Sequence, residues 1–150
     1  MQVGQTDGDI LMKSMIEFAG RLDQVSAGMR WIRAVAHSAG LPAKQVNALD
    51  LALEEIVTNI IKYGYDDEAE HMIQIDFELS STHAQLRVMD DAKPFNPLQV
   101  EKAQTLSSLE DVKIGGLGIL LVREVMDVVE YSRDGDRNVL VMKTLREPDE

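Results

Sequence analysis

Cysteine is absent from this 150-residue chain, which excludes a disulfide framework and a thiolate metal site. Apolar runs of membrane-spanning length are also missing, and the first nine residues are polar and acidic. We therefore expect no membrane segment and no signal peptide, and we expect a cytoplasmic protein. The three histidines, His37, His71 and His83, have no metal-ligand spacing, so each is expected to be a surface or turn residue.

Basic residues are scarce relative to acidic ones. The chain has 15 Lys and Arg against 26 Asp and Glu, a formal net charge of −11. This balance opposes non-specific binding to nucleic acid or to an anionic membrane, so neither is an expected partner. It leaves room for a basic protein partner or for a local basic pocket that binds phosphates. The length suits a single domain over residues 1–150, and no repeat or linker divides the chain.

Apolar periodicity predicts both strands and helices. Half-buried strands alternate between apolar and polar side chains, whereas amphipathic helices repeat apolar side chains every three or four residues. The segments with the strand pattern are 10–18, 73–79, 84–88, 128–133 and 138–145. The segments with the helical pattern are 21–38, 43–63 and 117–127. Short turns between strand segments predict two antiparallel hairpins, the first from 73 to 88 and the second from 128 to 145.

Two polar side chains stand beside the apolar stripe of the predicted helix 43–63. Glu55 and Asn59 are four residues apart, and therefore lie one turn apart on the same side. Asn supplies a neutral oxygen ligand to Mg²⁺, which takes its other ligands from waters and phosphates. Glu can orient or deprotonate a hydroxyl that attacks a phosphoryl group. Taken alone, the same spacing also fits the solvated side of an amphipathic helix.

Two features later in the chain are suited to binding a phosphate group and an amine. Gly115-Gly116-Leu117-Gly118 runs into an apolar helix, where glycines allow close backbone approach and free N–H groups can bind phosphate. A flexible loop before a packed helix is the alternative, and neither the P-loop nor the Rossmann pattern of glycines is present. Asp90 ends an apolar strand, where its carboxylate can accept a hydrogen bond from an exocyclic amine such as that of adenine. Its alternative is a solvated turn residue.

The order of these features resembles the Bergerat ATP-binding fold (GHKL) of histidine kinases, gyrase-type topoisomerases, heat-shock chaperones and mismatch-repair ATPases. The matching features are Glu55-x-x-x-Asn59, Asp90-x-Ala92 and the glycines of 115–118. Within that fold the chain is most similar to the bacterial anti-sigma factor serine/threonine kinases, over about residues 10–145. The resemblance implies an α+β fold, a two-layer α/β sandwich with helices on one face of a mixed, mostly antiparallel sheet. It also implies that residues 98–114 form an ATP lid.

The resemblance implies a role for each matched residue. Glu55 would be the general base, Asn59 the Mg²⁺ ligand, and Asp90 the partner of the adenine amine. The glycines would let their loop close over the phosphates. The full implied ATP-binding set is Asn59, Lys62, Asp90, Ala92, Phe95, Gly115, Gly116, Leu117 and Gly118, with Lys62 reaching a phosphate. The family usually has Gly where this chain has Ala92, whose Cβ is expected to crowd the adenine or to strain a positive φ.

The implied function is that of an ATP- and Mg²⁺-dependent protein serine kinase that is also an anti-sigma factor. Its substrate would be a serine on a small anti-anti-sigma (STAS-type) partner, it would sequester a sigma factor, and it would be a homodimer by analogy. The alternative is a nucleotide-gated protein-binding module with little or no kinase activity. Glu55 favours the enzyme, whereas Ala92 favours the module.

Overall fold

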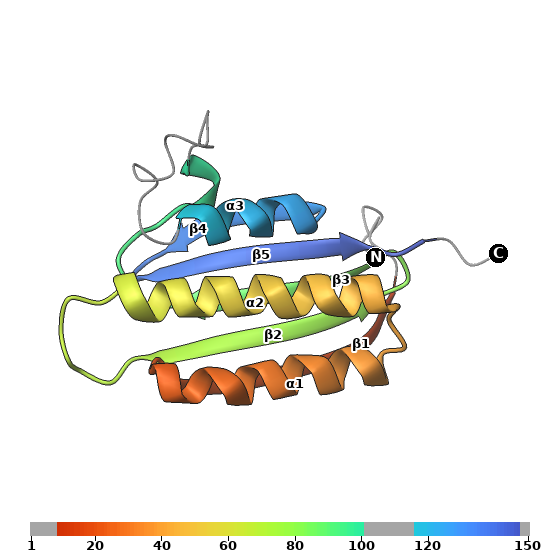
Figure 1. The fold of residues 1–150 in the computed structure, drawn as a ribbon, viewed down its shortest axis with the longest axis horizontal. Coiled ribbons are helices and arrows are strands. Elements are labelled where there is room, and N and C mark those ends of the chain that lie inside the picture. The colour runs from red at the N-terminus through yellow and green to blue at the C-terminus, as the bar shows by residue number, and fades with distance from the viewer. Residues whose placement is uncertain (1–8, 101–115, 148–150) are drawn as a thin grey trace.

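The computed structural model describes residues 9–100 and 116–147, which contain five strands and three α-helices (Figure 1). In chain order the elements are β1 (Ile10–Ala19), α1 (Val25–Ser38), α2 (Ala43–Tyr63), β2 (Met72–Ser80), β3 (His83–Asp90), α3 (Gly116–Val125), β4 (Val128–Asp134) and β5 (Arg137–Leu145). Two short 3-10 helices, Leu22–Gln24 and Pro97–Gln99, complete the set in these residues. None of the helices here is both long and apolar enough to cross a membrane.

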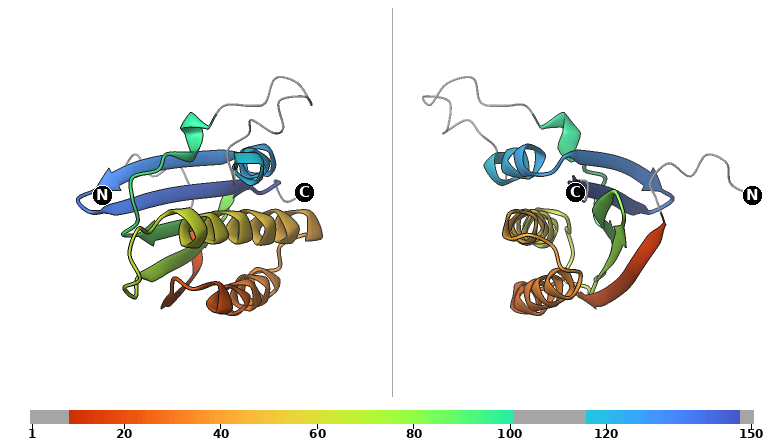
Figure 2. Two further views of the ribbon diagram at one scale, coloured as in Figure 1. Left: turned by 60° about the vertical axis from the view of Figure 1, so that its left-hand side comes forward. Right: turned by 90° about the vertical axis from the view of Figure 1, so that its right-hand side faces the viewer.

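The five strands form one sheet in the order β1-β2-β3-β5-β4. Every pairing between these strands is antiparallel. The three helices lie together on one face of the sheet, which the end-on view shows as two separate layers (Figure 2). The fold is therefore the expected α+β sandwich, and both predicted hairpins are confirmed.

Strand alternation places the core between the two layers. Ile73, Ile75 and Phe77 of β2 are fully buried, and the residues between them face away from the helices. The antiparallel register sets Ile75 opposite Val88 and adds a second buried row from β3. Helix α2 contributes the buried stripe that its spacing predicts. This packing fixes α2 lengthwise across the middle of the sheet (Figure 1).

The main difference from the expected elements is at the start of the first helix. The predicted helix 21–38 begins as a 3-10 turn at 22–24, and α1 itself starts at Val25. Arg21 has an extended backbone, and its carbonyl accepts a hydrogen bond from Gln24 N at 2.9 Å, which closes the tighter turn. At the other end, Gly40 takes a φ of +73° just past α1, a conformation that glycine adopts without strain, and Pro42 directly precedes α2.

Candidate functional site

Asp90 ends β3 with its side chain almost fully buried. Its Oδ1 accepts hydrogen bonds from Asn138 Nδ2 at 2.9 Å and from the Ala92 backbone N at 3.0 Å. Burial raises the pKa of this carboxyl, and the two hydrogen bonds oppose that rise. Both hydrogen bonds that described residues give to Asp90 use Oδ1. Its Oδ2 therefore remains to accept a hydrogen bond from a donor such as an exocyclic amine.

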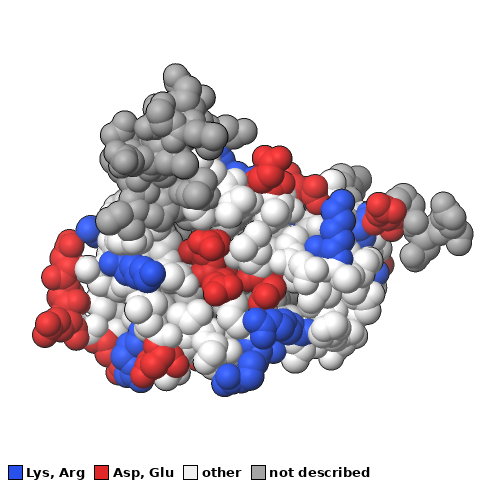
Figure 3. All heavy atoms as spheres, viewed as in Figure 1, with Lys and Arg blue, Asp and Glu red and all other residues white. Residues whose placement is uncertain are grey.

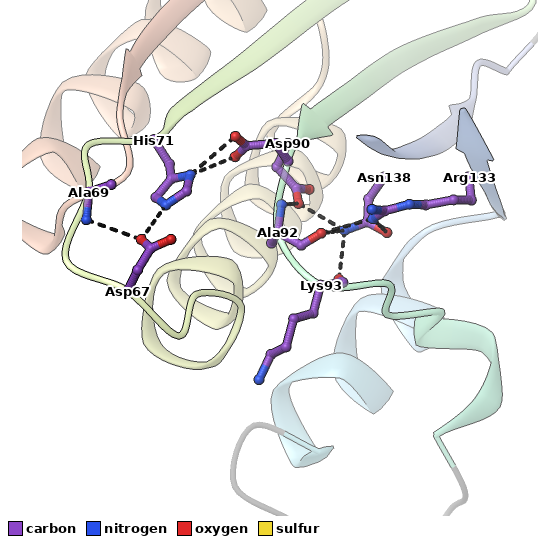
Figure 4. A network of polar contacts seen from close by, with 9 residues as sticks. Asp67, Ala69, His71, Asp90, Ala92, Lys93, Arg133 and Asn138 are labelled. Carbon is purple, nitrogen blue, oxygen red and sulfur yellow. Dashed lines mark hydrogen bonds and ion pairs between the residues drawn. The ribbon is translucent and has the colours of Figure 1, made fainter. Parts of the chain in front are cut away.

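Asn138, which sequence reasoning missed, organises the backbone around Asp90 (Figure 4). It lies on β5, is 6% exposed and pairs directly with Asp90 in the β3–β5 register. Its Nδ2 also donates to Lys93 O at 2.9 Å and to Ala92 O at 3.3 Å. Its Oδ1 accepts from Tyr131 OH, Arg133 Nη1 and Phe95 N, at 2.5, 3.2 and 3.4 Å. A carboxamide can do both because it carries two N–H donors and an oxygen with two lone pairs, and with three partners at each atom the longer contacts are shared.

Ala92 fits its position without backbone strain. No described residue other than glycine has a positive φ, so the expectation of strain at Ala92 is wrong. The side chain is buried, and a Cβ added to Gly64 would lie only 2.7 Å from Ala92 Cβ. The missing side chain at Gly64 therefore makes the room that Ala92 occupies. That Ala92 crowds an adenine stays a prediction.

Glu55 and Gly118 are brought into contact although they are far apart in sequence. A Cβ added to Gly118 would lie 2.8 Å from Glu55 Cδ and closer still to Oε2. Only a residue without a side chain can place α3 this close to the Glu55 carboxylate. The first turn of α3 begins at Gly116 and includes Leu117, so the free N–H groups of a helix start lie at this end of the site.

Helix α2 joins the two halves of the site. Glu55 contacts Gly118 from the middle of α2, and Gly64 contacts Ala92 just past its C-terminal end. These nine residues of helix rise about 13 Å, long enough for a nucleotide to lie along them. Asn59 and Lys62 lie between, half-buried and exposed respectively, and neither side chain has a hydrogen bond or ion pair with another described residue.

Other expected site residues are placed less fully. The Phe95 ring is 42% exposed. Gly115 and residues 101–114 of the expected lid 98–114 lie outside the described residues. The described start of that segment contains the 3-10 helix Pro97–Gln99, where the Asn96 side chain accepts a hydrogen bond from Leu98 N at 2.9 Å.

For a divalent cation, the expected ligand Asn59 would supply one oxygen and not a complete coordination shell. In the parts of the chain that the structure describes, no three His, Cys, Asp or Glu side chains gather into a possible metal site. Asn59 offers one neutral oxygen on α2. This donor set fits Mg²⁺, which keeps several waters and takes ligands from bound phosphates. A Mg²⁺ ion held by Asn59 would therefore need its remaining ligands from waters and phosphates.

The connector between α2 and β2 is tied to its surroundings by charge. Its acidic side chains gather at the left edge of the molecule in the view of Figure 3. Asp66 pairs with Lys93 Nζ at 3.0 Å, Asp67 with His71 Nε2 at 2.7 Å, and Glu70 with Arg21 Nη1 at 3.5 Å. The expectation that every histidine is a surface or turn residue is wrong for His83, which is buried in β3.

The chain is similar to one family of ATPase domains and to several named protein kinases and anti-sigma factors. The histidine kinase-like ATPase domain family matches residues 18–144. The chain is 25% identical over 140 residues to the serine-protein kinase RsbW of Listeria innocua, covering 90% of this chain and 88% of that protein. It is 21% identical to the anti-sigma F factor of Clostridium beijerinckii, covering 87% and 92% respectively. The serine/threonine-protein kinase BtrW of Bordetella bronchiseptica is 23% identical, with 79% and 84% covered.

Proposed function

This chain belongs to the histidine kinase-like ATPase domain family, and we propose that it is an ATP-dependent protein serine kinase that also acts as an anti-sigma factor. The observation that carries the proposal is the pair of contacts along α2. A carboxylate that can act as a base touches the start of α3 at one end, and a buried carboxylate stands near the other. The names of the relatives, serine-protein kinase and anti-sigma F factor, support both halves of the proposal.

In the proposed mechanism the nucleotide lies along α2 with its base at Asp90. Asp90 Oδ2 accepts the hydrogen bond of the adenine amine, while Asn138 and the Ala92 N–H fix Oδ1. The N–H groups of the first turn of α3 and the Lys62 ammonium bind the phosphates. Asn59 would hold Mg²⁺, which would supply positive charge beside the transferred phosphoryl group.

Glu55 acts on the other substrate in this proposal. Its carboxylate accepts the proton of the attacking serine hydroxyl as the oxygen forms its bond to the γ-phosphorus and ADP leaves. Contact with Gly118 sets the carboxylate beside the start of α3, where the γ-phosphate is expected.

The proposed partners follow from the names of the relatives. The serine would belong to a small anti-anti-sigma (STAS-type) protein, and the protein would sequester a sigma factor, which the names serine-protein kinase and anti-sigma F factor support. The homodimer and the cytoplasmic location are proposed from the family resemblance alone. The strong negative charge of the chain favours basic surfaces on these partners. On the face that carries the helices, acidic and basic side chains are interspersed (Figure 3), so no extended basic patch suited to nucleic acid is seen there.

The test compares two neighbouring glutamates. Glu55→Gln keeps the size of the side chain but removes the proton acceptor, so phosphoryl transfer from labelled ATP should fall by about 10²- to 10⁴-fold. ATP affinity should change little, because Asp90 and α3 are untouched. Glu54→Gln is the matched control, since Glu54 is exposed and points about 100° away around α2. Equal losses in both variants would indicate a general charge effect and contradict the role of Glu55.

A nucleotide-gated binding module is the second candidate, and Ala92 favours it. The Cβ of Ala92 is buried against Gly64 at the segment that would meet the base. The module requires ATP or ADP binding that alters partner binding, without phosphoryl transfer in the parent protein. Incubation of the protein with labelled ATP and a co-purified anti-anti-sigma partner decides between the two, because only a kinase labels the partner serine.

A further inference from the structure

The connector between α2 and β2, residues 64–71, crosses to the segment that follows Asp90, and we call these residues the strap. The strap contacts residues 91–93 in several ways. Gly64 O accepts a hydrogen bond from Lys93 N at 3.0 Å, and Asp66 pairs with Lys93 Nζ. His71 at the end of the strap reaches Asp91, the residue directly after Asp90. The strap therefore influences where the end of β3 lies.

His71 faces a carboxylate from each of its two ring nitrogens (Figure 4). Nε2 lies 2.7 Å from Asp67 Oδ1, and Nδ1 lies 3.0 and 3.1 Å from the two oxygens of Asp91. A neutral imidazole carries a single N–H and would turn a lone pair toward one of these carboxylates, whereas an imidazolium donates to both. The geometry therefore fits the cation and not the neutral ring.

The surroundings of His71 keep this arrangement rigid. Its ring stacks on Tyr65, with centroids 4.0 Å apart and an angle of 11° between the planes. Its backbone carbonyl accepts a hydrogen bond from Gly20 N at 2.7 Å, and its side chain is only 16% exposed. Within the described residues, the titratable groups that face the ring are Asp67, Asp91 and Tyr65. The neighbouring acidic groups Asp66 and Glu70 are paired with Lys93 and Arg21.

The neighbouring carboxylates shift the pKa of His71 in the direction that a cationic ring requires. Hydrogen bonds to Asp67 and Asp91 raise the pKa of His71, against the opposing effect of burial. The hydrogen bond from His71 lowers the pKa of Asp67. Burial, together with the carboxylates of Asp90, Asp91 and Asp67, raises the pKa of Tyr65, so its hydroxyl stays neutral and adds no charge beside the imidazolium.

We propose that His71 is a positioning residue for the nucleobase end of the site. As a cation between Asp67 and Asp91 it fixes residues 91–93, and with them the Asp90 carboxylate, in the arrangement that receives the base. This inference rests on the proposed function of Asp90. The affinity for nucleotide then depends on the protonation of His71, about 20 residues from Asp90 in sequence. The site residues alone do not provide this dependence.

The direction of the pH dependence follows from the raised pKa of His71. The bridge is fully formed below the ordinary histidine value of about 6.5 and is lost as the pH rises through the higher folded pKa. Protonation of Asp90 weakens binding at the acidic end, where the carboxylate no longer accepts the amine hydrogen bond. Loss of affinity on the alkaline side is therefore the signature of His71.

The test measures ADP affinity by calorimetry from about pH 6 to about pH 9. In the parent protein, affinity should fall by about 5- to 30-fold across this range, a typical size for coupling between two sites. His71→Gln removes the charge and should bind weakly throughout. His71→Arg keeps a planar cation that can stack on Tyr65 and donate to both carboxylates, so it should keep its affinity at the alkaline end.

His37→Gln is the matched control. His37 is exposed in the last turn of α1, and the variant should reproduce the parent profile, including any titration of the nucleotide phosphates, which is common to all variants. Parent-like affinity of His71→Gln at every pH would overturn the inference. So would an alkaline loss in His71→Arg equal to that of the parent. Thermal unfolding near pH 6 checks that each variant is folded.

A second readout separates this inference from the proposed function. The ring signals of His71, followed by NMR in the nucleotide-free protein, should titrate above the ordinary histidine value, and Asp91→Asn should lower that pKa. ADP binding with a normally titrating His71 would overturn only the inference. Absence of ADP binding in the parent would overturn the proposed nucleotide site itself, and the role of His71 with it.

Discussion

The β4–β5 hairpin and the strap hold the same short segment, residues 90–93, from two sides (Figure 4). On the hairpin side the contacts are hydrogen bonds of the buried Asn138 amide, together with Arg133 Nη1, which donates to Ala92 O at 2.8 Å. On the strap side they are the backbone hydrogen bond from Lys93 N to Gly64 O and two ion pairs, and the Lys93 and Asp66 side chains of one pair are 53% and 77% exposed. The hydrogen bonds centred on Asn138 are largely sealed from water, whereas the Lys93–Asp66 pair is open to it.

Because of this difference in burial, the two sides position residues 90–93 in different ways. A buried donor or acceptor that loses its partner costs about 1–3 kcal/mol, so the hairpin contacts are hard to exchange. An exposed ion pair contributes at most about 1 kcal/mol and weakens with salt. We infer that the hairpin fixes the position of Asp90, while the strap adjusts it and can respond to pH. The predictions below test that division, starting with the largest expected effect.

Replacing Asn138 with Ala should be the most damaging change on either side. It removes a donor from the buried Asp90 carboxylate and an acceptor from Tyr131, so we expect a loss of about 3 kcal/mol in the free energy of unfolding. Denaturant unfolding measures it. Asn96→Ala is the control, because Asn96 makes a single, exposed hydrogen bond to Leu98 N and should cost about 1 kcal/mol or less. Equal losses would contradict the importance of the buried side.

Gly64→Ala should rank second, because it acts where the strap leaves α2. The new Cβ would lie 2.5 Å from Ile60 O and 2.7 Å from Ala92 Cβ, so the backbone must shift at a cost of about 2 kcal/mol. Adding Ala92→Gly removes the second of these clashes only. The double variant should therefore recover part of the stability in denaturant unfolding. Full recovery would mean that Ala92 alone sets the fit, and no recovery would mean that the Ile60 carbonyl does.

The strands, the helices and two of the site residues show what the sequence alone can predict. The strands and helices follow from local periodicity, because every second residue of β2 and every third or fourth of α2 faces the core. Glu55 and Asn59 are recognisable for the same reason, since helical spacing alone places them on one side. The individual elements and these two site residues are thus encoded within short windows of the chain, whereas the sandwich architecture is expected from the family resemblance.

Asn138 and His71 could not be found in this way. The side chain of Asn138 meets Asp90, 48 residues earlier, only because β3 and β5 pair in one particular register. His71 depends on Asp91, 20 residues later, across a connector whose acidic composition alone indicates only a solvated loop. Gly64 and Ala92 likewise compensate each other through a contact that neither local pattern contains. Contacts of this kind depend on which strands are neighbours, and the periodicity within one strand does not say that β3 lies beside β5.

Lys93→Met should have a small effect, because it removes only the exposed pair with Asp66. We expect the free energy of unfolding to change by about 0.5 kcal/mol or less. The long apolar stem is kept, and the Lys93 N–H still donates to Gly64 O. Unfolding at low ionic strength and at about 1 M salt should show that the difference vanishes when charges are screened. A salt-independent loss above 1 kcal/mol would place the strap with the hairpin as a rigid support.

Tyr65→Phe should have the smallest effect, and it separates the two sides most cleanly. The Tyr65 hydroxyl is buried and has no hydrogen-bond partner among the described residues, so removing it should leave the free energy of unfolding nearly unchanged or raise it slightly. The Phe ring keeps the stack on His71, and the ring titration of His71 should stay the same. Tyr131→Phe is the matched control, because it deletes the same atom where that atom donates to Asn138 Oδ1, and it should cost about 1 kcal/mol. Denaturant unfolding of the two variants gives the comparison directly. If Tyr65→Phe is the more damaging of the two, the strap contains a buried polar contact, and its description as the open, adjustable side is wrong.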